Sequence, residues 1–267
     1  MAASSPLGVY DSGVGGLTVV RQLRRQLPRE QIIYLADTAR LPYGNREPEE
    51  IITFARQIIT FLVGQGVKLI LIACNTSSAL ALPLVEKEYT VPLVGMIQPG
   101  VQQALQETTA RRIGVMATEA TVKSGAYEQA LHERGEKVQV FSQACPLFVP
   151  LIEGGLLESP QMDAALGDYL EPLRQQGIDT LIYGCTHYPF LDSQIKARWP
   201  GLRTIDPAES AVARGAQILK DRGQLAMKKS GPDLFLTTGS AEEFAQKGAF
   251  FLGEELGQIQ SVILPKL

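Results

Sequence analysis

The sequence has no apolar stretch that approaches the roughly 18 residues needed to span a bilayer. Its first ten residues, MAASSPLGVY, have neither the basic start nor the long apolar core of a secretory signal. We therefore expect a cytoplasmic protein without a membrane partner. Basic runs are also missing and the formal net charge is −3, so we expect no nucleic-acid partner.

Cysteine and histidine are scarce, with three and two residues in a chain of 267. An odd number of cysteines without an export signal predicts reduced thiols rather than a disulfide framework. These cysteines and histidines form no CxxC or HxxxH pair, which argues against a metal site. Thiol chemistry therefore stays available.

The common cofactor motifs are missing as well. The segment GVGGLT has Thr18 where a dinucleotide-binding G-x-G-x-x-G motif has its last glycine, and G-x-x-x-x-G-K-[ST] does not occur. A pyridoxal phosphate lysine leaves no comparable motif, but that cofactor would leave a pair of similar thiol sites unexplained. We expect no cofactor.

What the sequence does contain is a regular alternation of apolar runs and amphipathic segments, with 45% hydrophobic residues overall. Helices are expected at Leu17–Leu27 and Pro48–Gln65. Strands are expected to begin at Leu7, Ile32, Lys68, Leu93, Ile113, Val138, Thr180, Arg203, Leu234 and Ser261. The alternation predicts an α/β fold with helices around mostly parallel sheets.

Two of the cysteines stand in similar settings. IACNTSSA contains Cys74 and YGCTHYPF contains Cys185, and each cysteine follows an apolar strand-like run. Ligands of open α/β sheets bind beyond the carboxyl ends of the strands. We therefore expect the two thiols on opposite walls of one cleft between two lobes.

Further landmarks recur at nearly the same separation as the two cysteines. Gly8 aligns with Gly114, Ile97-Gln98-Pro99 with Ile205-Asp206-Pro207 and, less closely, YLADTARLP with VFSQACPLF. This repetition predicts an ancient duplication, in which each half ends in an Ile-x-Pro strand exit. The predicted lobes are residues 1–98 with 207–267, and residues 99–206.

Two opposed thiols suit a reaction that inverts a stereocentre. A cysteine at the start of a helix is expected to reach the thiolate state, because a helix N-terminus lowers the pKa of a thiol. One thiolate then removes a proton from carbon and the opposite thiol returns one to the other face. The reverse reaction exchanges the two roles.

Four motifs together resemble the cofactor-independent glutamate racemases of the aspartate/glutamate racemase superfamily, over nearly the whole chain. They are DSGVGG from Asp11, Asp37-Thr38 with Pro42-Tyr43-Gly44, CNTSSA from Cys74, and GCTHYP from Gly184. Ser77 departs from the alanine expected there. The resemblance implies a two-lobed fold, D- or L-glutamate as the small-molecule substrate, and supply of D-glutamate for bacterial peptidoglycan.

The resemblance also implies roles for single residues. Cys74 would deprotonate D-glutamate and Cys185 L-glutamate, with Asp11 beside the first thiol, His187 beside the second, and Glu153 a further carboxylate of the cleft. The positions that hold the substrate are matched by Asp11, Ser12, Pro42, Tyr43, Gly44, Asn75, Thr76, Thr118, Thr121, Thr186 and His187. Cys145 is expected only to pack.

Two other functions remain open at this point. One is a racemase of another acidic amino acid such as aspartate, although the histidine after Cys185-Thr186 favours glutamate. The other is a non-catalytic dicarboxylate-binding protein, which would have no need of both thiols. The oligomeric state stays open, with a homodimer as one possibility.

Overall fold

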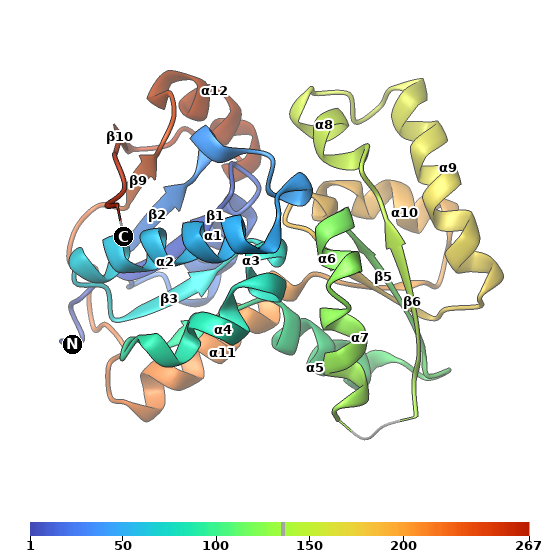
Figure 1. The fold of residues 1–267 in the computed structure, drawn as a ribbon, viewed down its shortest axis with the longest axis horizontal. Coiled ribbons are helices and arrows are strands. Elements are labelled where there is room, and N and C mark those ends of the chain that lie inside the picture. Colours follow the sequence, from blue (N-terminus) through green and yellow to red (C-terminus); the bar gives the residue numbers. More distant parts are fainter. Residues whose placement is uncertain (135–136, 267) are drawn as a thin grey trace.

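The computed structural model describes residues 1–134 and 137–266. Two parallel β-sheets, each flanked by helices, lie side by side (Figure 1). The larger sheet has the strand order β10 (Gln258–Ser261), β9 (Leu234–Thr237), β2 (Ile32–Ala36), β1 (Leu7–Asp11), β3 (Leu69–Ile72) and β4 (Leu93–Val94). The smaller sheet has the order β6 (Gln139–Ala144), β5 (Arg112–Ala117), β7 (Thr180–Gly184) and β8 (Arg203–Ile205). The α/β fold with two lobes is confirmed.

The two sheets share an arrangement of four strands. In chain order, the second, first, third and fourth strands lie next to one another as β2-β1-β3-β4 and again as β6-β5-β7-β8. The last two strands, β9 and β10, extend the larger sheet beyond β2. This shared order supports the proposed duplication, while the lobe boundaries at residues 98 and 206 remain a prediction.

The apolar runs form strands because both faces of each sheet are covered by helices. All residues of β1, β2, β3 and β7 are buried. Helix α1 (Leu17–Gln26) ends one residue before the predicted end. Helix α2 (Pro48–Gly64) begins at the predicted proline, with a capping box formed by Glu47 and Glu50.

The other helices complete the two layers around each sheet. They are α3 (Asn75–Leu80), α4 (Leu82–Val85), α5 (Ile97–Glu107), α6 (Glu119–Lys123), α7 (Ala126–His132), α8 (Phe148–Glu153), α9 (Pro160–Gln175), α10 (Asp192–Arg198), α11 (Pro207–Asp221) and α12 (Ala241–Leu252). Short 3₁₀ helices cover η1 (Thr38–Arg40), η2 (Tyr43–Asn45), η3 (Glu86–Glu88) and η4 (Tyr188–Leu191). No helix in residues 1–134 and 137–266 combines the length and the apolar character needed to cross a membrane.

Two sequence predictions about strand ends are wrong. The last strand ends at Ser261 instead of beginning there, since residues 258–261 pair with β9. The apolar residues Val262 and Leu264, which suggested a strand, are partly buried beyond its end. Ile97 begins α5 and is no strand exit, because β4 has only two residues and the chain bends at Met96 before the helix. A Cβ atom at Gly95 would lie 2.6 Å from Leu82 Cδ2 and 3.1 Å from Ser78 Cβ, so a larger residue there would displace the Leu82 side chain.

Candidate active site

A pocket of about 160 Å³ lies between the two sheets, beyond the carboxyl ends of β1, β3, β5 and β7. Most of the residues expected at the site line it. They are Asp11, Ser12, Pro42, Tyr43, Gly44, Cys74, Asn75, Thr76, Thr118, Cys185, Thr186 and His187. The remaining two, Thr121 and Glu153, lie outside the wall but contact residues in it.

Sequence reasoning missed several residues of the wall, namely Leu41, Asn45, Glu119, Cys145, Pro146, Val149, Pro150 and Gly184. Four of these neighbour a motif residue in the chain. The others follow β6. The alignment of VFSQACPLF with the Pro42 loop could have indicated Cys145 and Pro146, whereas Val149 and Pro150 lie beyond the aligned segment. Cys145, expected only to pack, is buried in the wall, and its Sγ donates to the Gln143 carbonyl at 3.5 Å.

The first thiol lies at the start of a short helix. Cys74 occupies the N-cap position of α3 and is buried. Burial raises the pKa of the Cys74 thiol to about 12, and the nearby charge of Asp11 adds to this increase. Hydrogen bonds from Ser77 act in the opposite direction but are outweighed. The expected lowering of the pKa by the helix start is therefore wrong for Cys74, which is a neutral thiol at pH 7.

Asp11 ends β1 and its carboxylate caps the loop that follows. Its Oδ2 accepts hydrogen bonds from the N–H groups of Gly13 at 3.2 Å and Gly16 at 2.9 Å. Burial raises the pKa of Asp11, while the neighbouring His187 acts to lower it. Among the described residues, Oδ1 of Asp11 has no hydrogen-bond partner. The Asp11 carboxylate is therefore a buried acceptor in the pocket wall, fixed by the loop that follows β1.

The second thiol is linked to a chain of ionisable groups. Cys185 Sγ lies 3.7 Å from His187 Nδ1, and His187 Nε2 lies 3.1 Å from Glu153 Oε1. Burial alone would lower the pKa of His187, but its contacts with Cys185 and Glu153 raise it to about 10. His187 is therefore an imidazolium at pH 7, and it lies in contact with the Cys185 sulfur.

The glycine loop of the first sheet packs against the second cysteine motif. A Cβ atom at Gly15 would lie 2.3 Å from Thr186 Oγ1 and 2.4 Å from His187 Cε1. Thr18 Oγ1 also lies 3.3 Å from the Thr186 carbonyl. The motifs that contain Asp11 and Cys185 therefore meet through contacts that leave no room for a side chain at residue 15.

Hydroxyl groups cluster on the Cys74 side of the pocket. Thr76, Thr118 and Thr121 place their Oγ1 atoms 3.0–3.2 Å from one another. Asn75 Oδ1 accepts a hydrogen bond of 2.7 Å from the Tyr127 hydroxyl. These neutral groups, with the backbone N–H groups at helix starts, suit the carboxylates of a small acidic ligand.

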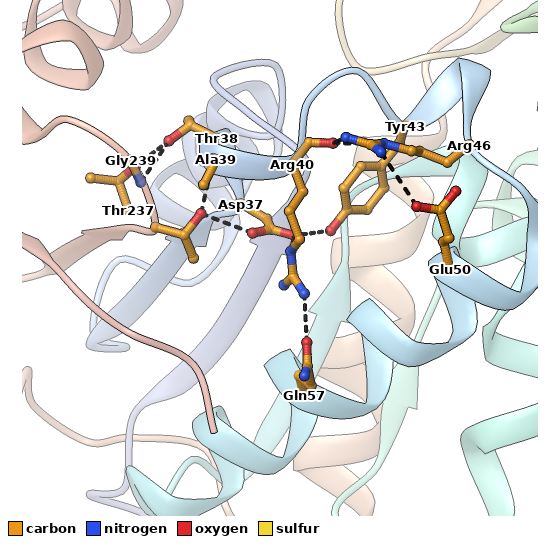
Figure 2. A network of polar contacts seen from close by, with 11 residues as sticks. Asp37, Thr38, Ala39, Arg40, Tyr43, Arg46, Glu50, Gln57, Thr237 and Gly239 are labelled. Atoms are coloured by element: carbon orange, nitrogen blue, oxygen red, sulfur yellow. Dashed lines mark hydrogen bonds and ion pairs between the residues drawn. The ribbon is translucent and has the colours of Figure 1, made fainter. Parts of the chain in front are cut away.

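The loop with Pro42, Tyr43 and Gly44 is fixed by a buried carboxylate, Asp37, which follows β2 (Figure 2). The Tyr43 hydroxyl and Arg40 Nε both donate to Asp37 Oδ2, the latter at 2.6 Å. At the end of β9, the Thr238 hydroxyl donates to Asp37 Oδ1 at 2.8 Å. Two neighbouring strands of the larger sheet thus hold Tyr43 in the pocket wall.

The described part of the chain contains no group of three or more His, Cys, Asp or Glu side chains that could hold a metal ion. The chemistry available from the residues present is that of thiols, an imidazolium and carboxylates. Because Cys74 and Cys185 come from different sheets and line the same pocket, they can approach one small ligand from two sides.

Known proteins are similar to this chain over most of its length. The family model described as Asp/Glu/Hydantoin racemase matches residues 15–215. A glutamate racemase of Picosynechococcus sp. is 46% identical over 94% of this chain and 89% of its own. The solved structures include a glutamate racemase isoform from Bacillus anthracis (38% identity, TM-score 0.93) and a glutamate racemase from Francisella tularensis in complex with D-glutamate (35% identity, TM-score 0.92), each covering 98% of both chains. The chain therefore belongs to the Asp/Glu/hydantoin racemase family, and the enzyme class expected from its motifs, an amino-acid racemase, is confirmed.

Proposed function

We propose that this chain is a glutamate racemase that interconverts L- and D-glutamate at the α-carbon without a cofactor. The observation that supports this most strongly is the pair of thiols from two sheets in one pocket, Cys74 beside Asp11 and Cys185 beside His187. The similar proteins from Picosynechococcus, Bacillus anthracis and Francisella tularensis are all glutamate racemases.

The different neighbours of the two thiols give them different roles in the first step. Cys185, beside the His187 imidazolium, acts as the base on L-glutamate, and the neutral Cys74 thiol is ready to act as the acid. The Cα–H bond breaks with its proton going to Cys185 Sγ, and Cys74 delivers its proton to the opposite face of the planar carbanion. Cys74 is then a thiolate, which is the form that accepts D-glutamate.

The other residues of the wall hold the substrate. Asn75, Thr76, Thr118 and Thr186 supply neutral donors for its two carboxylates, and the Asp11 carboxylate accepts from its ammonium group. Tyr43, fixed by Asp37, closes the wall and keeps water from the carbanion. The donors stabilise the charge that develops next to the α-carboxylate.

The resemblance to glutamate racemases supports a physiological role as well. D-glutamate made in the cytoplasm would serve peptidoglycan synthesis, and a homodimer is the assembly to test first. The competing substrate is aspartate, which is one methylene shorter.

Polarimetry of separate D-glutamate, L-glutamate and L-aspartate solutions tests the proposal, with purified protein and no added cofactor. We expect the rotation of both glutamate solutions to decay to zero and that of aspartate to persist. Decay with aspartate alone would identify the other substrate. Inertness toward all three would favour the non-catalytic binding protein.

A further inference from the structure

Helix α12 reaches from the larger sheet to the Cys185 side of the pocket. It follows β9, a strand of the larger sheet, whereas Glu153 ends α8 and His187 follows β7 of the smaller sheet. Figure 1 shows α12 and α8 near one another on the same side of the molecule. Lys247 of α12 lies 3.1 Å from Glu153, with its Nζ on Oε2.

The carboxylate of Glu153 is thus held at both oxygens. Oε1 contacts His187 Nε2 at 3.1 Å, and Oε2 contacts Lys247 Nζ at the same distance. The side chain of Glu153 is 15% exposed and that of Lys247 is 50% exposed. A carboxylate held only through Oε1 could rotate away from the imidazole, whereas a cation on Oε2 fixes its plane.

Aromatic packing keeps α12 next to the imidazole. The Phe251 ring lies 5.1 Å from the His187 ring at an interplanar angle of 76°. Phe250 stacks on Phe190 at 5.2 Å, and Phe190 follows His187 closely in the chain. Lys247 is therefore presented to Glu153 by a helix that already packs against His187 itself.

We propose that Lys247 is a positioning residue of this enzyme, which acts through Glu153 to hold His187 against Cys185. The proposal rests on the racemase function proposed above. Lys247 does not line the pocket, so it contacts no substrate, and its removal should slow the proton transfer at Cys185 without weakening substrate binding.

A double-mutant cycle tests this coupling, using Lys247→Met, Glu153→Gln and their combination. We expect Lys247→Met to lower kcat for both enantiomers by about threefold to tenfold, with KM changed by less than about twofold. Lys247→Arg keeps a cation and should recover most of the loss. In the Glu153→Gln background, Lys247→Met should have no further effect.

The matched control is Lys220→Met, which removes an exposed lysine from the end of α11 and should leave kcat unchanged. A kcat for Lys247→Met equal to that of Lys220→Met would overturn the proposal. An equal loss from Lys247→Met with and without Glu153 would also overturn it, because Lys247 would then act by another route.

A second readout does not depend on activity. The chain has two histidines, so His132→Gln assigns the ¹H–¹³C NMR signal of the His187 imidazole. We expect Lys247→Met to move this signal, Lys247→Arg to move it less, and Lys220→Met to leave it in place. A wild-type protein that does not racemise glutamate would refute the proposed function. The coupling of Lys247 to His187 is tested separately, because an unmoved His187 signal in Lys247→Met would contradict it.

Discussion

Gly15 and Thr186 lie in loops that follow strands of different sheets, β1 and β7, yet a Cβ atom at residue 15 would lie 2.3 Å from Thr186 Oγ1. The same atom would lie 2.4 Å from His187 Cε1, so the two motifs are in direct contact at the pocket. The position of the second thiol therefore depends on the absence of a side chain in the glycine loop.

Gly15→Ala should displace Thr186 and His187 and lower kcat/KM on the order of 100-fold, as small misplacements of catalytic groups do. Coupled-assay kinetics with both enantiomers measures this. The matched control is Gly64→Ala, whose Cβ meets nothing within 4 Å at the end of α2 and which should keep full activity. Equal activity of the two variants would contradict the close contact.

Cys74→Ala and Cys185→Ala should each lower racemisation in both directions by about 10³-fold or more, because every turnover needs one base and one acid. Cys145→Ala, although it changes the pocket wall, should keep turnover within about threefold and cost about 1 kcal/mol of stability. Steady-state kinetics and urea unfolding measure the two effects. Near-normal turnover of either of the first two variants would refute the two-thiol mechanism.

Alkylation by iodoacetamide near pH 7 should modify Cys185 before Cys74. Cys74 is a neutral thiol because burial raises its pKa to about 12, whereas the His187 imidazolium lies beside Cys185. Burial also raises the pKa of Cys145, which should react slowly too. Peptide mass mapping at partial inactivation gives the order, and bound glutamate should protect. Preferential labelling of Cys74 would contradict this assignment.

The contribution of the protonated His187 to the free energy of unfolding should fall as the pH rises. Its pKa is raised from 6.5 to about 10 in the folded protein, so below pH 6.5 both folded and unfolded chains carry the proton and the stabilisation is complete. Between pH 6.5 and about 10 the unfolded chain loses this proton first, and the advantage of the folded state declines. Urea unfolding of the wild type and His187→Gln across this range measures it, and a difference in unfolding free energy that stays constant would contradict the raised pKa.

Tyr43→Phe should raise KM for glutamate severalfold, because the loop in the pocket wall loses its bond to Asp37. Asp37 keeps Arg40 and Thr238 as partners, so the stability cost should be about 1–3 kcal/mol. Tyr89→Phe, which removes a hydroxyl bonded to Thr60 away from the pocket, serves as the control for kinetics. An unchanged KM in Tyr43→Phe would show that the loop is fixed by other contacts.

Local patterns were sufficient to predict most of the fold. Ile51, Ala55 and Ile58 repeat at helical spacing and are buried on one face of α2, whose boundaries lie within one residue of the prediction. The prediction that a strand begins at Ser261 was wrong because apolar residues indicate burial and do not show which residues pair in the sheet. Val262 is partly buried without belonging to β10.

Residues of the site could be predicted only where a reactive side chain follows a predicted strand or belongs to a recognisable motif. Cys74 and Cys185 were found in this way, but the raised pKa of Cys74 depends on burial by residues distant in the chain. The contact from Lys247 through Glu153 to His187 joins three separate segments. No local pattern indicates which lysine on the surface will reach Glu153.

The separate roles of Cys74 and Cys185 are tested most directly by racemisation of D-glutamate in deuterated water, with mass spectrometry of both enantiomers in the first few per cent of reaction. Cys74 removes protium from one face, and Cys185, already exchanged with solvent, delivers deuterium to the other. The two-thiol mechanism predicts that early L-glutamate is almost wholly deuterated at the α-carbon while the remaining D-glutamate stays mostly protiated. Substantial protium in the early L-glutamate would contradict it, because a single base would then be carrying the proton from one face to the other.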